Sequence, residues 1–258
     1  MKLLTILGLV FVAGPVLHAQ ATGTNLTVDV TIKSIAVRGD TMGLTYVVLN
    51  KATSRDPLLR FAVDAPAGVK SIPLPQPATS YFVLGTYQGR PMAEWMFLDF
   101  LAPGATSIPV YFESVGLPAI ATHWAGGDDP PVDESVADST SEDPLKYHAV
   151  AGKTVGVEPW PVDKSAKALI ARLKTLTQTS CATPLKWITA SSLCTKLLGY
   201  LTTAETNRAA GKVTLAKSSM ATYIKSLAGK TAGTFATGVT SPAYWLLKTN
   251  ADIVVSKL

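Results

Sequence analysis

The chain has 258 residues, a formal net charge of +5, and only two cysteines and three histidines. So few sulfur and imidazole ligands exclude a zinc site, and the cysteine spacing excludes a CxxC redox centre. The charge is unevenly divided. Residues 22–125 contain 7 basic residues (Lys and Arg) and 7 acidic residues (Asp and Glu). Residues 126–163 contain 2 basic and 9 acidic residues, and residues 164–258 contain 13 basic and 2 acidic residues. This division predicts a neutral domain, an acidic connection and a basic domain.

The first 21 residues have the pattern of a secretory signal peptide. Lys2 supplies the charged n-region, Leu3–Val12 is the apolar h-region, and Ala19-Gln20-Ala21 is a small-residue cleavage site. The apolar run is too short for a transmembrane helix, and no later stretch is long and apolar enough to span a bilayer. We therefore expect a secreted protein, periplasmic or fully extracellular, with no transmembrane segment.

Residues 22–125 are expected to form an immunoglobulin-like β-sandwich. Apolar residues alternate from Leu26 to Ile32 and then change phase near Lys33-Ser34, which predicts a strand with a β-bulge. A turn is expected over Arg38–Gly43. The other expected strands are 44–49, 59–63, 81–84, 95–100, 108–112 and 120–124. Seven short strands separated by Gly and Pro turns in about a hundred residues are typical of this sandwich.

Residues 126–163 are expected to be an acidic, Pro-rich linker with a docking segment. Residues 126–144 contain 7 acids and neither a base nor an aromatic residue, so they bury too little apolar surface to fold alone. Val150–Val157 fits a short extended segment, and Trp160, between two prolines, is expected to dock on the helices. Four acids in this range could supply oxygen ligands for calcium: Asp128, Asp129, Asp133 and Glu134. Their spacing is not that of an EF-hand loop, so a solvated linker is favoured.

Residues 164–258 are expected to form a C-terminal α-helical bundle, which makes the whole chain an α+β multidomain protein. The first helix, Lys164–Thr179, has apolar residues at helical spacing and an N-cap at Asp163 or Ser165. The other three helices are delimited by Gly or Pro and fit Ser192–Ala210, Thr214–Ala228 and Ser241–Leu258. In the last of these, Ser241 is expected to be the N-cap.

The two cysteines, Cys181 and Cys194, enclose 12 residues between the first and second expected helices. An isolated pair this close in an exported protein indicates a structural disulfide across the helix connection. A loop of this size contributes about 3 kcal/mol in the chain-entropy model. The sequence therefore predicts a disulfide-stapled helical domain over residues 164–258.

The stretch Leu193–Leu258 resembles the FIMAH domain, a small helical module at the C-terminal end of secreted bacterial proteins. The similar pieces are L-C-T-K-L-L-G-Y-L, A-A-G-K-V-T-L-A-K-S-S-M-A-T-Y-I and Y-W-L-L-K-T-N-A-D-I-V. The resemblance implies a helical fold and a location outside the cell, and it implies no activity. The phrases F-A-V-D-A-P-A-G-V and F-E-S-V-G-L-P are similar to uncharacterised secreted bacterial proteins that combine a sandwich with such an end.

No catalytic, cofactor or metal constellation stands out in the sequence. His123 and His148 have no histidine or cysteine partner at ligand spacing, and the motifs G-x-S-x-G, H-E-x-x-H and G-x-x-x-x-G-K-[ST] do not occur. The carboxylates that would serve glycoside hydrolysis are Glu94, Asp99 and Glu113, although charged residues on the outer face of strands are the default. The aromatic residues available for a sugar-stacking platform are Tyr81, Tyr87, Trp95 and Trp124.

We therefore expect a secreted, non-enzymatic interaction or surface-associated protein, without catalytic residues, cofactor or metal. The alternative hypothesis is a carbohydrate-binding module, and the third hypothesis is a secreted glycoside hydrolase. Solvent exposure of the sandwich tryptophans separates the first two, and a cleft with two facing carboxylates would favour the third. The expected partners are an extracellular polysaccharide, an anionic polymer or a cell-envelope protein. Nucleic acid is not expected, because the lysines are spread over all four helices without interleaved aromatics.

Overall fold

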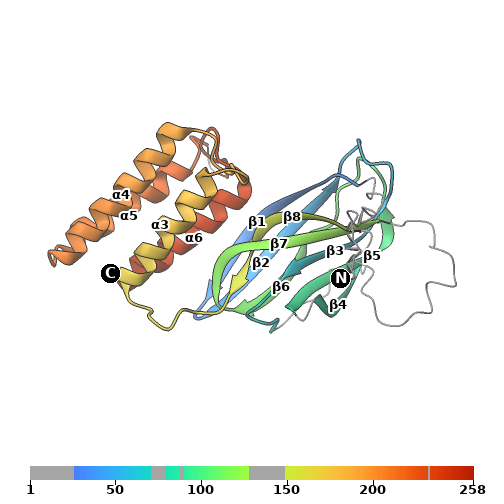
Figure 1. Ribbon diagram of the computed structural model, residues 1–258, viewed down its shortest axis with the longest axis horizontal. Coiled ribbons are helices and arrows are strands. Elements are labelled where there is room, and N and C mark those ends of the chain that lie inside the picture. Colours follow the sequence, from blue (N-terminus) through green and yellow to red (C-terminus); the bar gives the residue numbers. More distant parts are fainter. Residues whose placement is uncertain (1–25, 71–79, 88–89, 128–148, 232) are drawn as a thin grey trace, which may run out of the picture.

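The computed structural model describes five stretches of the chain, which are residues 26–70, 80–87, 90–127, 149–231 and 233–258. These stretches form an α+β structure in which eight strands come before four helices. Figure 1 shows the strands gathered on one side and the helices on the other. The predicted signal peptide lies outside the described residues.

The strands form two antiparallel sheets. The first sheet has the order β1-β2-β6 and consists of β1 (Val28–Arg38), β2 (Thr41–Asn50) and β6 (Val110–Val115). The second has the order β4-β5-β3-β7-β8 and consists of β3 (Leu58–Asp64), β4 (Ser80–Tyr87), β5 (Arg90–Leu101), β7 (Leu117–Gly127) and β8 (Ala149–Glu158).

An aromatic core joins the two sheets face to face. Tyr46 of β2 lies 5.9 Å from Phe61 of β3 and 6.1 Å from Trp95 of β5, measured between ring centroids. Phe112 of β6 stacks on Tyr46 at 6.1 Å. The Tyr46 hydroxyl donates a hydrogen bond to the Val155 carbonyl at 2.7 Å, so its polar end is satisfied inside the core. The strand region is therefore a two-layer sandwich with large interlocking rings at its centre.

The seven strands expected between residues 26 and 125 are all present. The expected bulge is confirmed as a register shift between Ile32 and Ser34, where β1 pairs with β2. The expected turn after β1 is a tight hairpin, and Gly39 adopts a φ of 63° in it. As expected of a central strand, β2 has partners on both sides.

The structure corrects the extent of the sandwich. The extended segment predicted over Val150–Val157 is confirmed as β8 (Ala149–Glu158), but it does not belong to a linker over 126–163, because it pairs along its whole length with β7. Two of its glycines, Gly152 and Gly156, allow the strand to pack closely against its neighbours. A Cβ atom added at Gly156 would lie 2.9 Å from the Asp64 carbonyl oxygen. The sandwich therefore extends to Glu158.

The helices are α3 (Ala166–Cys181), α4 (Ser191–Ala209), α5 (Val213–Leu227) and α6 (Ser241–Lys257). Helix α3 packs on α4 and α6, and α5 packs on α4 and α6. Ser165 caps α3, as expected, because its hydroxyl accepts a hydrogen bond from the Ala168 amide. The cap expected at Ser241 is wrong: Thr240 caps α6, and its side chain accepts from the Ala243 amide.

Cys181 and Cys194 form a disulfide between the end of α3 and the beginning of α4. Their Cα atoms are 6.2 Å apart, which is within the usual range for a disulfide. No free cysteine remains in the chain, since these are its two cysteines. The covalent link therefore closes the helix connection that the sequence predicted.

The sandwich and the helices meet along α6, which lies beside β1 and the adjoining strands β7 and β8 (Figure 1). Ser241, which is free of the capping role, donates a hydrogen bond to the Ile32 carbonyl of β1 at 2.6 Å. Arg172 of α3 donates to the Pro118 carbonyl of β7 at 2.8 Å and pairs with Glu158 of β8 at 2.7 Å. Asn250 of α6 also donates to the Pro118 carbonyl, at 3.0 Å.

The segment before α3 contacts the β1–β2 turn of the sandwich. Trp160, expected to dock on the helices, donates from Nε1 to the Asp40 carbonyl of the β1–β2 turn at 3.3 Å. The Lys164 ammonium lies 4.8 Å from the centre of the Trp160 ring and 3.7 Å from the Asp40 carboxylate. Trp160 docks on the turn because the backbone carbonyl there gives its indole N–H an acceptor.

Candidate binding surfaces

The two sandwich tryptophans are buried. Trp95 is 1% exposed in the core between the sheets, and Trp124 is 9% exposed against Ala62 and Met92 on the other face of the second sheet. Neither ring can stack on a sugar without a change in structure. The side chains of Tyr81 and Tyr87, the other aromatic candidates, lie outside the described residues.

The three candidate carboxylates do not form a facing pair. Glu94 is buried on β5 between residues that point into the core, so it lies on the outer face of the second sheet, with Arg60 3.6 Å away. Glu113 follows core residue Phe112 on β6 and therefore lies on the outer face of the first sheet. Asp99 is exposed. Because the sandwich separates Glu94 from Glu113, these two cannot flank one glycosidic bond.

His123 is buried in the sandwich beside Phe61, with 6.0 Å between ring centroids. Burial, with a smaller contribution from the Lys153 charge, lowers the pKa of His123 to about 4. Its ring fits because the opposite residue on β8 is Gly152, where an added Cβ would lie 2.6 Å from Nε2. His123 is therefore a neutral core residue, and His148 lies outside the described residues.

No three His, Cys, Asp or Glu side chains in the described stretches lie together as metal ligands. The acids considered for calcium lie outside the described residues: Asp128, Asp129, Asp133 and Glu134. The same described stretches contain no helix long and apolar enough to cross a membrane.

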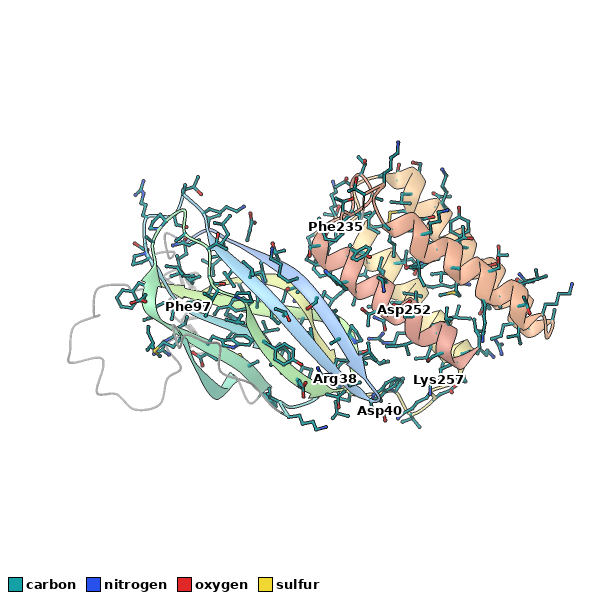
Figure 2. All side chains as sticks on the ribbon, turned by 180° about the vertical axis from the view of Figure 1, so that it is seen from behind. Arg38, Asp40, Phe97, Phe235, Asp252 and Lys257 are labelled. Atoms are coloured by element: carbon teal, nitrogen blue, oxygen red, sulfur yellow. A yellow bond between two sulfur atoms is a disulfide. The ribbon has the colours of Figure 1, made fainter. Side chains whose placement is uncertain are left out.

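The outer face of the three-stranded sheet carries a polar and aromatic group that we call the Tyr111 cluster, made of Arg38, Gly43, Tyr111 and Glu113. The Tyr111 ring lies over Gly43, where an added Cβ would come within 2.8 Å of two ring carbons. The Tyr111 hydroxyl donates to Glu113 Oε1 at 2.6 Å, and the Arg38 guanidinium is 3.3 Å from the same oxygen. Figure 2 shows Arg38 at the end of β1, with the helices standing beside this sheet.

The electrostatics of the Tyr111 cluster keep the tyrosine neutral. Partial burial, followed by the hydrogen bond to Glu113 and its negative charge, raises the pKa of Tyr111 to about 12. Arg38 is 75% exposed and Glu113 is 18% exposed. The cluster therefore offers a ligand one aromatic ring, a carboxylate and a guanidinium that faces solvent. Sequence reasoning missed it because its residues come from three strands.

The second sheet has a shallow pocket of about 310 Å³ near the junction with the helices. Lys153 and Thr122 lie at one side of it, and the Lys153 ammonium donates to the Thr122 hydroxyl at 2.9 Å. Glu158, on the other side, is the residue that pairs with Arg172 of α3. The remaining lining residues are Asp64, Pro66, Ala119, Ile120, Ala121 and Val157. This volume is at the lower end of the range for small-molecule sites.

Comparison with known proteins assigns the chain to no family. No protein family model matches the chain. No curated protein matches it. Among the solved structures that match is an uncharacterised protein from Nocardia farcinica described as having an immunoglobulin-like fold. It is 15% identical, covers 49% of this chain and 95% of its own length, and has a TM-score of 0.27. The resemblance to the FIMAH domain stays a prediction.

Proposed function

We propose that the chain is a secreted, non-enzymatic interaction protein that recognises its partner through the Tyr111 cluster on the open face of the three-stranded sheet. The observation that carries the proposal is that the Tyr111 hydroxyl and the exposed Arg38 guanidinium both contact Oε1 of the Glu113 carboxylate. These polar side chains already hold one another in place, so little conformational entropy is lost when a partner binds. The separation of Glu94 from Glu113 supports a protein without hydrolase activity.

The wider organisation belongs to the same proposal. Residues 1–21 direct export, and the two sheets form a sandwich of the immunoglobulin-like class. Of the acidic linker expected over 126–163, residues 128–148 keep that role between β7 and β8, and the four helices form a FIMAH-like bundle. The disulfide between Cys181 and Cys194 supports a location outside the reducing cytoplasm, where such bonds persist.

A carbohydrate is the second candidate partner, and the position of Tyr111 favours it. Sugar rings stack on aromatic faces, and their neighbouring hydroxyl groups bind carboxylates and guanidinium groups in pairs. The Tyr111 ring is held over Gly43 with Glu113 and Arg38 at its polar end. Because Trp95 and Trp124 are buried, such a platform would rest on Tyr111, which has a carboxylate and a guanidinium beside its hydroxyl.

The test is a binding screen with residues 22–258 against a glycan array and against cell-envelope fractions. Tyr111→Ala should weaken the strongest interaction by about tenfold, the equivalent of one lost aromatic contact. Tyr200→Ala, which changes a half-buried tyrosine of α4, is the matched control and should leave binding unchanged. Equal binding by the wild type and Tyr111→Ala would remove the Tyr111 cluster from the proposal. A glycan ligand would select the carbohydrate candidate, and a protein ligand would reject it.

A further inference from the structure

The connection between α4 and α5 forms a protruding end of the helical region, which we call the hairpin tip: Arg208, Lys212, Val213, Leu215 and Lys217. Val213 is 41% exposed and Leu215 is 52% exposed. Within the described residues of the four helices, these are the strongly exposed large apolar side chains. Figure 1 shows α4 and α5 on the side of the helical region that faces away from the sheets.

The sequence holds this tip in a fixed shape. Gly211 adopts a φ of 70° after the end of α4, and the Lys212 amide donates to the Asn207 carbonyl at 2.8 Å. In α5, Ala216 and Met220 are fully buried. Leu215 is out of phase with that buried stripe, so the helical period places it toward solvent. Val213 is in phase with the stripe but is the first residue of α5, and it is exposed at the end of the helix. The exposure of Leu215 therefore follows from the helical period, and that of Val213 follows from its position at the end of the hairpin.

The tip is also strongly basic. Residues 206–251 contain no Asp or Glu, while the bases in this range are Arg208, Lys212, Lys217, Lys225, Lys230 and Lys248. The acid that comes just before the tip, Glu205, is already paired with Lys174 of α3 at 2.5 Å. Lys174 and, to a smaller extent, Arg208 lower the pKa of Glu205, so this acid offsets part of the charge of Arg208. The next acid along the chain is Asp252, so α5 itself supplies no acid beside Lys212 and Lys217.

We propose that the hairpin tip docks on an anionic phospholipid surface. Two aliphatic side chains on a convex end enter the boundary between headgroups and acyl chains, while the lysines beside them keep their ammonium groups at the phosphates. Basic residues alone would fit any polyanion, but the exposed Val213 and Leu215 gain from contact with an apolar medium, which a soluble anionic polymer does not provide. The inference concerns the helices and does not rest on the Tyr111 cluster.

The experiment is sedimentation of residues 22–258 with vesicles of phosphatidylcholine alone or mixed with phosphatidylglycerol. Leaving out residues 1–21 prevents the apolar run Leu3–Val12 from binding lipid by itself. We expect binding to the anionic vesicles that weakens as salt rises from 0.05 to 0.5 M, because the charges become screened. The double variants Val213→Ser/Leu215→Ser and Lys212→Gln/Lys217→Gln should each lower the partition coefficient roughly tenfold or more.

Two matched variants on the sandwich control for general changes in apolarity and charge. Leu98→Ser removes an apolar side chain that is 54% exposed, and Lys33→Gln removes an exposed base of β1; both should bind vesicles like the wild type. Equal binding to neutral vesicles, or full binding by both tip variants, would overturn the proposal. The proposal would also be overturned if the tip variants lost heparin binding but still bound vesicles. That result would assign the hairpin tip to an anionic polymer. The vesicles carry neither glycan nor protein, so this outcome is separate from that of the Tyr111 test.

Discussion

The two regions of the molecule achieve cohesion by different means. The sandwich has an interior of large rings, Tyr46, Phe61, Trp95 and Phe112, which contact one another from strands far apart in the chain. The helical core is mostly aliphatic, and its fully buried aromatic residue, Tyr223, shares a hydrogen bond of 2.8 Å with Thr177. A disulfide closes the helical region but no covalent link crosses the sandwich. Long-range packing therefore stabilises one region, and local helices with a staple stabilise the other.

The surfaces of the two regions differ as well. Charges on the sandwich are matched in number and meet in cross-strand or neighbouring pairs, such as Arg38 with Glu113 and Arg60 with Glu94. In the helical region both acids are already engaged by lysines, Glu205 by Lys174 and Asp252 by Lys248. The other bases there create a net positive field. This contrast suits a sandwich that binds by local geometry and helices that approach anionic surfaces from a distance.

The largest effect is expected in the aromatic core. Trp95→Ala should lower the free energy of unfolding by about 3–5 kcal/mol, because it leaves a cavity among Tyr46, Phe61 and Phe112 that cannot fully collapse. Urea unfolding followed by far-UV circular dichroism measures the loss. Trp95→Phe fills part of the cavity and should cost clearly less. A loss below 1 kcal/mol for the alanine variant would contradict the central role of this ring cluster.

Acid should destabilise the sandwich through His123. Its pKa is lowered to about 4 in the fold and is about 6.5 when unfolded, so the unfolded chain binds the proton first as pH falls. The stability that the neutral imidazole provides is complete above pH 6.5 and is lost between pH 6.5 and 4, by about 3 kcal/mol in total. The measurement is urea unfolding of the wild type and His123→Gln at several pH values.

The difference between those two proteins isolates the buried histidine, because His148 and all carboxylates are common to both. The wild type should lose more stability than His123→Gln over this pH range. Parallel pH profiles would show that His123 accepts a proton in the fold without cost. Gly152→Ala, which places a Cβ against the same ring, should destabilise the wild type by about 1–3 kcal/mol but His123→Ala much less.

In the helical region the disulfide should give the next effect. The double variant Cys181→Ala/Cys194→Ala should lose about 3 kcal/mol, because the open loop gives the unfolded chain more conformational freedom. Thermal unfolding followed at 222 nm, with and without reductant, measures this. Reduction should lower the stability of the wild type and leave the double variant unchanged. If intact mass shows that the reductant has opened the disulfide and the wild type is nevertheless equally stable, the stabilising role of the disulfide is contradicted.

Local patterns in the sequence were enough to predict much of the fold. The bulge near Lys33-Ser34 follows from a change of apolar phase, and the disulfide follows from an isolated cysteine pair. For β8 the sequence predicted only a short extended segment over Val150–Val157, and not its pairing with β7 as a strand of the sandwich, because Gly152 and Gly156 interrupt its apolar pattern. These glycines make room for the His123 ring and for the Asp64 carbonyl, contacts that only the tertiary structure defines.

The candidate sites depend on register and docking, which the sequence leaves open. Tyr111 and Glu113 alternate on β6, but their placement over Gly43 and beside Arg38 depends on how β6 and β1 pair with β2. The cap of α6 was ambiguous for another reason. Thr240 and Ser241 are both good N-cap residues, and the contact of Ser241 with the sandwich decides between them.

The smallest expected effect concerns Arg172, which lies at the contact between the sandwich and the helices. Arg172 is only 16% exposed and donates to the Pro118 carbonyl, Glu158 and Asn250, so a single side chain reaches two strands and one helix. Arg172→Ala should cost about 1–3 kcal/mol through the hydrogen bonds it removes. Arg172→Lys keeps the charge but not the planar fork, so it should recover only part of this.

The measurement that distinguishes a junction from an ordinary surface contact is cooperativity. In the wild type, the amide protons of the strands and those of the helices, followed separately by hydrogen exchange as urea rises, should lose protection in one transition, because the contacts of Arg172 and Asn250 couple the two regions. In Arg172→Ala the two transitions should separate, with reductant shifting only the helical one. Lys196→Gln, at an exposed position of α4, is the control and should keep a single transition. Coincident transitions in Arg172→Ala would show that the apolar contacts of α6 with β1 couple the regions without this arginine.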